Sequence, residues 1–563
     1  MVFQPKIFET LKHYSKEKLT ADLMAGIIVG IVAIPLAVAF GIASGVGPTE
    51  GLVTAIIAGF IISFFGGSRV QIGGPTGAFI VIVYGIIQQH GLAGLLIATI
   101  MAGIMLILMG VFKLGNIIKF VPYPVIIGFT AGIAVTIFST QIKDLFGLDI
   151  DNLPANFVDK WIVYFKNISE TNLVTLLLGV LSILIIVLVP KISKKIPGSL
   201  VAIVVVTVAV WLLNSSGTFG HIKTIGDIYQ LPSGIPSPKM PTLTLAEGTT
   251  IIDLMVQLFP AAFTIAMLGA IESLLSAMVA DGVIADKHNS NTELIGQGIA
   301  NIVTPLFGGI PATGAIARTM TNINNGGRSP IAGIIHAVTL LLVLLFLGKL
   351  VGYIPMACLA GVLVVVSYNM SGWRSIAALR KMPMSDNAVM WITIVLTVVF
   401  DLTIAIEIGL LLSVVLFLKR TSEATSIKIF GSEIDPNIES DLELHEEKLL
   451  VPEGVAVYEI DGPYFFGVAN KFDEIMTRMS KPPRVRIIRM RRVPFIDSTG
   501  LHNLENLCIQ SRRQGSIVIL SGVTMQVRKT LLKAKFDYII PEDHICSHIN
   551  IALKKADEIL HQE

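Results

Sequence analysis

Two apolar stretches of the chain share one interruption: Phe65-Gly66-Gly67 leads on to Thr76-Gly77-Ala78, and Phe307-Gly308-Gly309 leads on to Thr313-Gly314-Ala315. Each interruption ends a helix of membrane length and begins a helix that is too short to cross a bilayer. Paired interruptions, one in each half of a chain, are typical of a transporter's ligand site. Helix N-termini offer free N–H groups and a positive dipole end, so the pattern predicts an anion as the ligand.

The composition indicates a membrane body followed by a soluble domain. Of the 563 residues, 53% are hydrophobic, and a mean hydropathy of +0.75 excludes an ordinary soluble protein. Residues 426–563 hold 38 of the 82 charged residues, and the first 425 positions hold the other 44. We therefore expect a cytoplasmic segment over 1–21, a transmembrane domain over 22–420, a linker over 421–450 and a soluble domain over 451–563.

The sequence carries none of the patterns that mark an enzyme or a metal protein. Cys358, Cys508 and Cys546 are scattered without metal-ligand spacing, and there is no catalytic triad or phosphate loop. We expect no cofactor, no metal and no enzymatic activity, and nothing in the charge pattern indicates nucleic acid as a partner.

Apolar runs of about 20 residues predict fourteen membrane segments, although some runs merge and twelve or thirteen segments also fit. Segments three (76–88) and ten (313–324) are exceptional, because each spans only about 18 Å of a hydrocarbon core of about 30 Å. Extended chain must complete them, and it is tolerated at that depth only where protein buries it or a cavity adjoins it.

Basic residues set the expected orientation. They flank the ends of even-numbered segments, for example at Lys113, Lys287 and Arg328, and they are frequent at the N-terminus. Such a bias predicts a multi-pass cell-membrane protein with both termini in the cytoplasm. Segments three and ten then run in opposite directions, as in an inverted repeat, with their N-termini facing each other. Tight helix packing could explain one such interruption, but two matching ones favour a site.

Charged residues deep in apolar segments are functional candidates, because each costs about 2.5–3.5 kcal/mol to insert. Arg318 lies one turn into segment ten, on the same helical face as Gly314. In the eighth segment, Glu272 shares a face with Gly269 and Ser276. We expect Arg318 to contact the anion. We expect Glu272 and Ser276 to serve in coupling. The structural alternative is a permanent ion pair between Glu272 and Arg318.

Glu272 and Arg318 together provide a physical route to proton coupling. Burial favours the neutral form of Glu272, whereas Arg318 favours the charged form. An anion bound at Arg318 would offset that influence, so Glu272 would take up a proton more readily. By linkage, protonation would then tighten anion binding. The co-transported ion is therefore expected to be a proton, with sodium as the alternative.

The C-terminal region predicts a small α/β domain. Strands are expected over 455–460, 485–490 and 516–520, and helices over 468–480, 499–514, 524–536 and 544–561. Asp497 or Ser498 can cap the helix that follows the second strand. Ser498 also offers an accessible hydroxyl beside a carboxylate.

Motifs along nearly the whole chain resemble the SulP (sulfate permease) family, bacterial relatives of solute carrier family 26. The matching stretches are Ala33-Ile34-Pro35, Gly73-Gly74-Pro75-Thr76-Gly77-Ala78, Asn291-Thr292-Glu293-Leu294-Ile295-Gly296-Gln297-Gly298, Ala317-Arg318-Thr319 and Asn325-Gly326-Gly327-Arg328-Ser329. The C-terminal region resembles a STAS domain (sulfate transporter and anti-sigma factor antagonist) at Asp497-Ser498-Thr499-Gly500.

The resemblance implies two inverted seven-helix repeats, a mobile core, a gate domain that forms a homodimer, and elevator-like transport. It places the coupling acid at Glu272 and makes Ser498 a regulatory candidate, because the loop serine of related domains can be phosphorylated. A cytosolic partner of the STAS domain is a further possibility. The implied anion-binding residues are Gly77, Ala78, Phe79, Ala315, Ile316, Ala317 and Arg318.

The chain shows three departures from patterns found in the family that it resembles. Leu36 replaces a frequent glutamine and Ala317 a frequent serine, so the site depends more on backbone and Arg318. Sodium-dependent bicarbonate carriers of the family have Asp at the Glu272 position and no basic residue at the Arg318 position, which favours proton coupling here.

Secondary active transport of an inorganic anion is therefore the expected function. Sulfate is the default substrate, with bicarbonate or a C4-dicarboxylate as alternatives. Two other classes remain open. One is a membrane signalling protein that works through its STAS domain. The other is a nucleobase permease, which Arg318 disfavours because that family binds an uncharged base.

Overall fold

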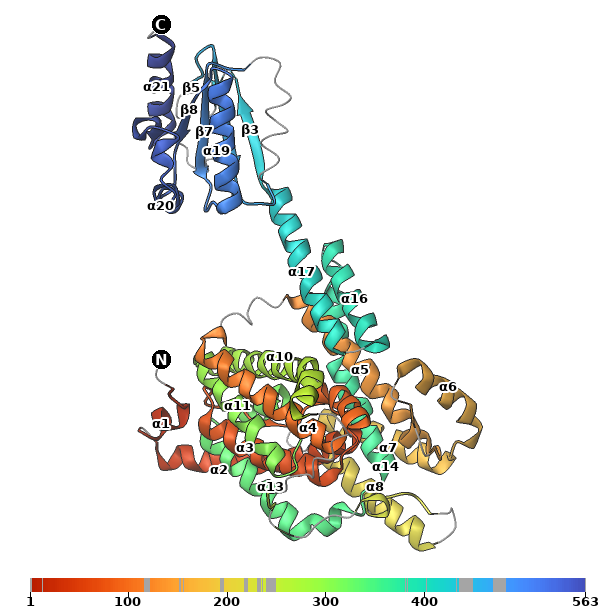
Figure 1. Ribbon diagram of the computed structural model, residues 1–563. Coiled ribbons are helices and arrows are strands. Elements are labelled where there is room, and N and C mark those ends of the chain that lie inside the picture. Colours follow the sequence, from red (N-terminus) through yellow and green to blue (C-terminus); the bar gives the residue numbers. More distant parts are fainter. Residues whose placement is uncertain are drawn as a thin grey trace. The chain divides into compact units, whose positions relative to one another are not determined.

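The chain divides into two compact units, Met1–Ser413 and Val414–Glu563, which Figure 1 traces from red to blue. The computed structural model describes residues 3–12, 14–115, 122–150, 153–154, 156–192, 197–216, 221–229, 234, 236–238, 250–379, 381, 383–400, 402–431, 433–434, 449–468 and 482–561. The predicted helix over 468–480 lies almost wholly outside the described residues, as does half of the predicted linker.

Helices lie over each of the fourteen predicted membrane segments, and segments three and four are two parts of α4 that meet at Gly91, where φ is 64°. Among the described residues, nine helices are long and apolar enough to cross a membrane. The multi-span helical body is thus confirmed, and the number of spans stays a prediction. The helices are α2 (Lys16–Ala43), α3 (Pro48–Phe65), α4 (Ile80–Val111), α5 (Tyr123–Phe146), α7 (Leu173–Ile192), α8 (Gly198–Ser216), α10 (Ile251–Ile284), α11 (Ser290–Leu306), α12 (Ile316–Asn324), α13 (Pro330–Val351), α14 (Met356–Met370), α16 (Met384–Val399) and α17 (Leu402–Ala424).

Shorter elements connect these helices. They are α1 (Lys6–Leu11), α6 (Phe157–Asn167), the 3-10 turn η3 (Ile168–Glu170), α9 (Ile225–Ile228) and α15 (Trp373–Leu379). The first long helix begins at Lys16, before the transmembrane domain expected from 22, because Ser15 caps it by accepting a hydrogen bond of 3.3 Å from the N–H of Lys18.

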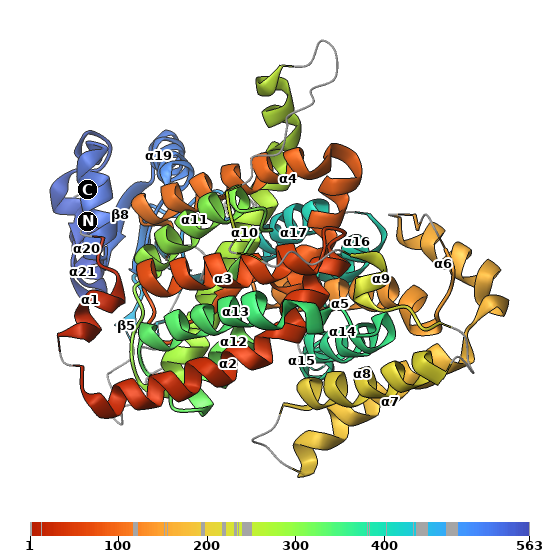
Figure 2. The same cartoon turned by 90° about the horizontal axis from the view of Figure 1, so that it is seen from below.

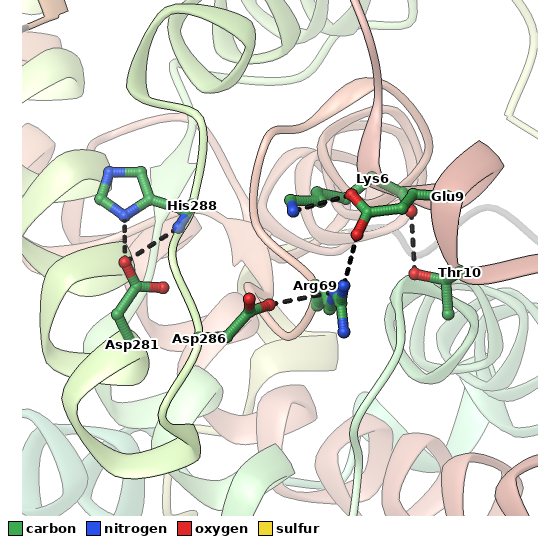
Figure 3. A network of polar contacts seen from close by, with 7 residues as sticks. All are labelled: Lys6, Glu9, Thr10, Arg69, Asp281, Asp286 and His288. Atoms are coloured by element: carbon green, nitrogen blue, oxygen red, sulfur yellow. Dashed lines mark hydrogen bonds and ion pairs between the residues drawn. The ribbon is translucent and has the colours of Figure 1, made fainter.

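The N-terminal helix α1 is tied to two connections of the first unit, as Figure 3 shows. Glu9 accepts from Lys6 at 2.8 Å and from Arg69 at 2.6 Å, and Arg69 also pairs with Asp286 at 3.0 Å. The hydrogen bond from Lys6 lowers the pKa of Glu9. The N–H of Lys6 donates to the carbonyl of Gly66 at 3.1 Å, so α1 lies against the connection between α3 and the first interruption.

The long helices of the first unit pack as two groups (Figure 2). The first helix group contains α2, α3, α4, α10, α11, α12 and α13. The second helix group contains α5, α7, α8, α14 and α16. Contacts within each group are more extensive than contacts between them.

The two interruptions meet as a short antiparallel ribbon. Strand β1 (Gly73–Gly74) pairs with β2 (Thr313–Gly314), with Gly73 opposite Gly314. The predicted extended completion of both short helices is thereby confirmed. A 3-10 turn, η1 (Gly77–Phe79), leads from β1 into α4. Helix α12 begins at Ile316 and not at the predicted 313, because Thr313 and Gly314 belong to the ribbon.

One buried carboxylate holds the chain that leads into the first interruption. Glu293 of α11 is 0% exposed. It accepts hydrogen bonds from the N–H groups of Gly67 at 2.8 Å and Ser68 at 3.0 Å. The side-chain amides of Gln71 and Gln297 donate to it at 2.9 and 2.8 Å. With four donors, this carboxylate is fully engaged in fixing the backbone.

The second unit is an α/β domain, as predicted. Its five-stranded sheet has the order β3-β6-β7-β8-β9, in which β3 is antiparallel to β6 and the other pairs are parallel. Side chains alternate along the strands, so that α19 and α20 cover one face and α21 covers the other. The elements are β3 (Ser426–Phe430), β4 (Glu433–Ile434), β5 (Leu449–Leu450), β6 (Val455–Asp461), β7 (Val485–Arg492), α19 (Ser498–Arg513), β8 (Ile517–Ser521), α20 (Met525–Lys533), η4 (Phe536–Tyr538), η5 (Glu542–His544), β9 (Ile545–Cys546) and α21 (Ile549–His561).

Two boundaries of this unit differ from the sequence-based expectation. Strand β3 lies inside the interval expected as a linker, and its pairing with β6 makes it part of the sheet. Helix α21 begins at Ile549 and not at 544, because Ile545 and Cys546 form β9.

Candidate functional site

A cavity of 430 Å³ lies between the two helix groups, beside the β1–β2 ribbon. The first helix group supplies residues from α2, α10, α12 and the two interruptions. The second helix group supplies Thr130 of α5 and three residues of α14. The lining consists of Leu36, Phe40, Pro75, Thr76, Gly77, Thr130, Glu272, Gly314, Ala315, Ile316, Ala317, Arg318, Val366, Asn369 and Met370.

Both interrupted helices begin at this cavity without a side-chain cap. Thr76 precedes η1 and Ala315 precedes α12, and neither N-terminus receives a capping hydrogen bond from a side chain. The first backbone bonds run from the N–H of Phe79 to Thr76 at 3.3 Å and from the N–H of Thr319 to Ala315 at 2.9 Å. The N–H groups that precede them have no helical acceptor. Two uncapped N-termini at one cavity favour an anion there.

Arg318 extends from α12 across to the first interruption. Its side chain is 2% exposed, and its Nη2 donates to the carbonyl of Pro75 at 3.2 Å. Its Nη1 has no hydrogen-bond partner in the described part of the chain. A Cβ at position 74 would lie 2.1 Å from that Nη1, and φ of Gly74 is 153°, so glycine is needed there. One end of the guanidinium is therefore left unpaired among the described residues, although Arg318 lines the cavity.

Glu272 of α10 lines the same cavity as Arg318, but the two side chains are not paired. The hydroxyl of Thr76 donates to Glu272 Oε2 at 2.9 Å. None of the ion pairs between described residues joins Glu272 to Arg318. In this structure the acid and the base therefore stand as separate groups at one cavity.

The predicted polar face of α10 divides into two parts. Ser276 lies outside the cavity lining, and its hydroxyl donates to that of Thr319 at 3.3 Å. Ser273, which the sequence analysis did not single out, lies 2.6 Å from the hydroxyl of Thr313 and accepts from the N–H of Gly314 at 3.1 Å. These serines attach α10 to β2 and α12, and only Glu272 faces the cavity.

The structure brings most of the predicted anion-binding residues together. Gly77 and the run from Ala315 to Arg318 line the cavity. Ala78 and Phe79 do not, because both are 0% exposed and their side chains point into the hydrophobic core from within the 3-10 turn. Thr130 and Asn369 come from the second helix group, and no motif marked them in advance. In the described ranges no cluster of metal-ligating side chains occurs.

In the second unit Asp497 caps α19, as one of the two sequence alternatives had it. Its carboxylate accepts from the N–H of Gly500 at 2.7 Å and from the N–H of Phe466 at 3.1 Å. Ser498 is the first residue of α19, and its side chain is exposed. The hydroxyl is therefore accessible to a modifying enzyme.

Two family models match the chain. The model of the sulfate permease family matches residues 19–393, and the model of the STAS domain matches residues 448–552. The solved transmembrane domain of a cyanobacterial bicarbonate transporter, BicA, is 33% identical and superposes with a TM-score of 0.63, covering 70% of this chain and 98% of that one. An SLC26A9 structure, 19% identical, shows the same overall fold with a TM-score of 0.83 over 98% of this chain and 92% of that one.

Full-length relatives agree with these matches. YvdB of Bacillus subtilis, whose description as a sulfate transporter is itself provisional, is 43% identical over 539 residues, or 95% of this chain and 98% of YvdB. The bicarbonate transporter BicA of a Synechocystis species is 33% identical over 89% of this chain and 88% of that protein.

Proposed function

The chain belongs to the sulfate permease family, and from this membership and the geometry of the cavity we propose that it transports a small inorganic anion across the cell membrane by secondary active transport. The observation that carries the proposal is Arg318. Its guanidinium is almost wholly buried, has a free Nη1 and lies between two uncapped helix N-termini. An anion is the ligand that satisfies all of these groups together.

Sulfate is the default substrate, and bicarbonate is the second candidate. The 43% identical relative favours sulfate, whereas the two 33% identical matches are to bicarbonate transporters. Backbone N–H groups and one guanidinium suit both anions, and a C4-dicarboxylate as well, so selectivity depends on the polar groups of the opposite wall. Thr130 and Asn369 provide those groups.

A proton is the proposed co-substrate, and Glu272 is its carrier. The carboxylate holds one hydrogen bond, from Thr76, and faces the cavity that Arg318 also lines. An anion at Arg318 reduces the positive charge that stabilises the ionised acid, so anion and proton bind with positive coupling. Ser276 supports this arrangement only indirectly, through Thr319.

The boundary position of the cavity supports an elevator-like cycle. All the charged groups of the site, and both helix N-termini, belong to the first helix group, whereas the second helix group supplies Thr130 and the residues of α14. Movement of the first group along the second would carry the site from one side of the membrane to the other. In this proposal both termini are cytoplasmic, the second group mediates a homodimer, and Ser498 is a regulatory phosphorylation site.

Uptake into proteoliposomes tests the proposal. Labelled sulfate, bicarbonate, succinate and uracil are offered with and without an inward proton gradient, and protein-free liposomes provide the background. We expect uptake of at least one anion, accelerated by the gradient. Uptake of uracil alone would overturn the substrate class, and anion uptake that ignores the gradient would overturn the coupling.

A further inference from the structure

A second cavity, of 280 Å³, lies towards the end of α2 at which Ala43 stands. It uses the same two helices as the central cavity, about one turn further along. On α2 it is lined by Ala39, Ile42 and Ala43, whereas Leu36 and Phe40 line the central cavity. On α14 it is lined by residues up to Leu363, and the central cavity is lined from Val366 onwards. The two cavities therefore succeed each other along one boundary between the helix groups.

Lys160 of the short helix α6 forms part of this second cavity. Lys160 is only 3% exposed, and its Nζ lies 5.8 Å from the ring centroid of Tyr84. Among the ion pairs of described residues, none includes Lys160. A lysine is almost never fully buried unless it is paired. The ring of Tyr84 offsets only part of the cost of burying the charge.

The other charges around the cavity do not neutralise Lys160. Within the described part of the chain, Lys143 and Asp144 of α5 are the other charged residues of the lining, so these two cations and one carboxylate leave one positive charge. The ammonium of Lys143 donates to the carbonyl of Ile150. Gln141 and Thr140, which are hydrogen-bonded to each other at 2.8 Å, add polar groups to the same wall.

We propose that this cavity is a second anion-binding site, in which the ammonium of Lys160 holds a small inorganic anion one turn of α2 away from the central cavity. A bound anion supplies a counter-charge that no ion pair among the described residues gives the ammonium. That an anion occupies this site before it reaches the central cavity rests on the proposed function. The binding of an anion at this site does not. The position of α6, far along the chain from every motif of the central site, explains why no sequence pattern marked it.

The protonation of Lys160 gives the site a pH dependence. Burial lowers the pKa of Lys160 to about 8. The side chain is therefore charged below about pH 8 and loses its charge as the pH rises above that value, which is when anion binding weakens. The other titratable groups that face the cavity are Lys143, Asp144, Tyr84 and Tyr229.

Sided transport tests the site. Labelled sulfate is presented to oriented proteoliposomes at either face, for the parent chain, Lys160→Gln and the control Lys166→Gln, which removes an exposed charge from the same helix. We expect Lys160→Gln to raise the Michaelis constant about tenfold at the α6 face alone, since a charge-assisted hydrogen bond is lost. The control should change neither face. Equal effects of the two variants, or an effect of Lys160→Gln at both faces, would overturn the proposal.

Two further readouts separate the charge of Lys160 from a structural role and from transport itself. In the parent chain, the Michaelis constant should rise between about pH 7 and pH 9. Lys160→Arg should keep the low Michaelis constant over this whole range, because arginine stays charged. In the purified full-length protein, sulfate but not gluconate should protect Lys160 from a small amine-reactive reagent, as measured by mass spectrometry. Protection without any transport would refute the proposed function and retain the site. Transport without protection would refute the site alone.

Discussion

Glu293 and Glu272 lie in the same helix group, yet their surroundings differ. Four donors surround the carboxylate of Glu293, two of them backbone N–H groups of the chain entering the first interruption. The carboxylate of Glu272 has one donor, Thr76, and faces a cavity. A buried acid whose hydrogen bonds are all made fixes the backbone. An acid at a cavity that can still accept further hydrogen bonds remains available to bind a proton. The hydrogen bonds around each carboxylate distinguish these two kinds of buried acid.

The largest expected effect is that of replacing Glu293, the glutamate whose hydrogen bonds are all made. Glu293→Ala should lower the free energy of unfolding by about 3 kcal/mol or more, because each buried donor left without an acceptor costs about 1–3 kcal/mol. The yield of folded protein and its thermal midpoint in detergent measure this effect. Glu272→Ala is the control, and it should leave the midpoint nearly unchanged. Equal midpoints for the two variants would remove the distinction between the two acids.

Arg318 provides the next largest effect. Arg318→Gln should weaken anion affinity about 10- to 100-fold, because the variant loses a charge-assisted interaction of about 1.5–3 kcal/mol. The Michaelis constant for uptake and anion-induced thermal stabilisation measure the loss. Arg374→Gln, which changes an exposed arginine of α15, should show neither. An unchanged Michaelis constant in Arg318→Gln would show that the helix N-termini bind the anion without it.

Glu272→Gln tests whether Glu272, the glutamate with a single hydrogen bond, binds the coupled proton. Exchange of internal for external anion should persist, while the acceleration by an inward proton gradient should disappear. Coupling energies of about 1–3 kcal/mol correspond to about a 5- to 150-fold change in anion affinity between the protonated and ionised forms of the parent chain. Thr76→Val is the companion variant, since it removes the hydrogen bond and keeps the acid. It should retain gradient-driven uptake, and loss of coupling in both variants would assign the role to the hydrogen bond and not to the proton.

In the number of hydrogen bonds that it accepts, Asp497 is intermediate between Glu272 and Glu293. It accepts two backbone hydrogen bonds at an exposed helix start. Asp497→Ala should destabilise α19 by about 0.5–2 kcal/mol, the usual cost of losing such a cap. Faster hydrogen exchange of the α19 amides in the full-length chain measures it. Ser498→Ala is the matched control and should leave exchange unchanged. If phosphorylation regulates transport, Ser498→Asp should alter the uptake rate and Ser498→Ala should not.

Much of the fold could be predicted because hydropathy and helix-breaking residues are local signals. The fourteen apolar segments, the two interruptions and the α/β nature of the second unit all follow from runs of adjacent residues. The pairing of Gly73 with Gly314 could not be predicted in that way, since it joins residues far apart in the sequence. Strand β3 was also missed, because an edge strand separated from its sheet by a long connection resembles a linker.

The site was predictable in part for the same reason. Arg318 and Glu272 stood out as charges in apolar segments, and both line the cavity. Ala78 and Phe79 do not line the cavity, because the 3-10 turn directs their side chains into the core, and their role in anion binding stays a prediction. Thr130 and Asn369 are ordinary polar residues of two helices, and only packing brings them to the cavity.

The β1–β2 ribbon has a consequence for the direction of transport. Gly73 and Gly314 lie opposite each other, and Arg318 of one interrupted helix donates to Pro75 of the other. The two helix starts are therefore held to each other, so in the proposed elevator-like cycle the anion would meet the same groups of the first helix group at either end. A carrier whose binding groups keep their arrangement has nearly the same affinity for its cargo on both sides. In the proposed cycle the net flux would then follow the combined gradients of the anion and the proton, so that one molecule would serve uptake or release.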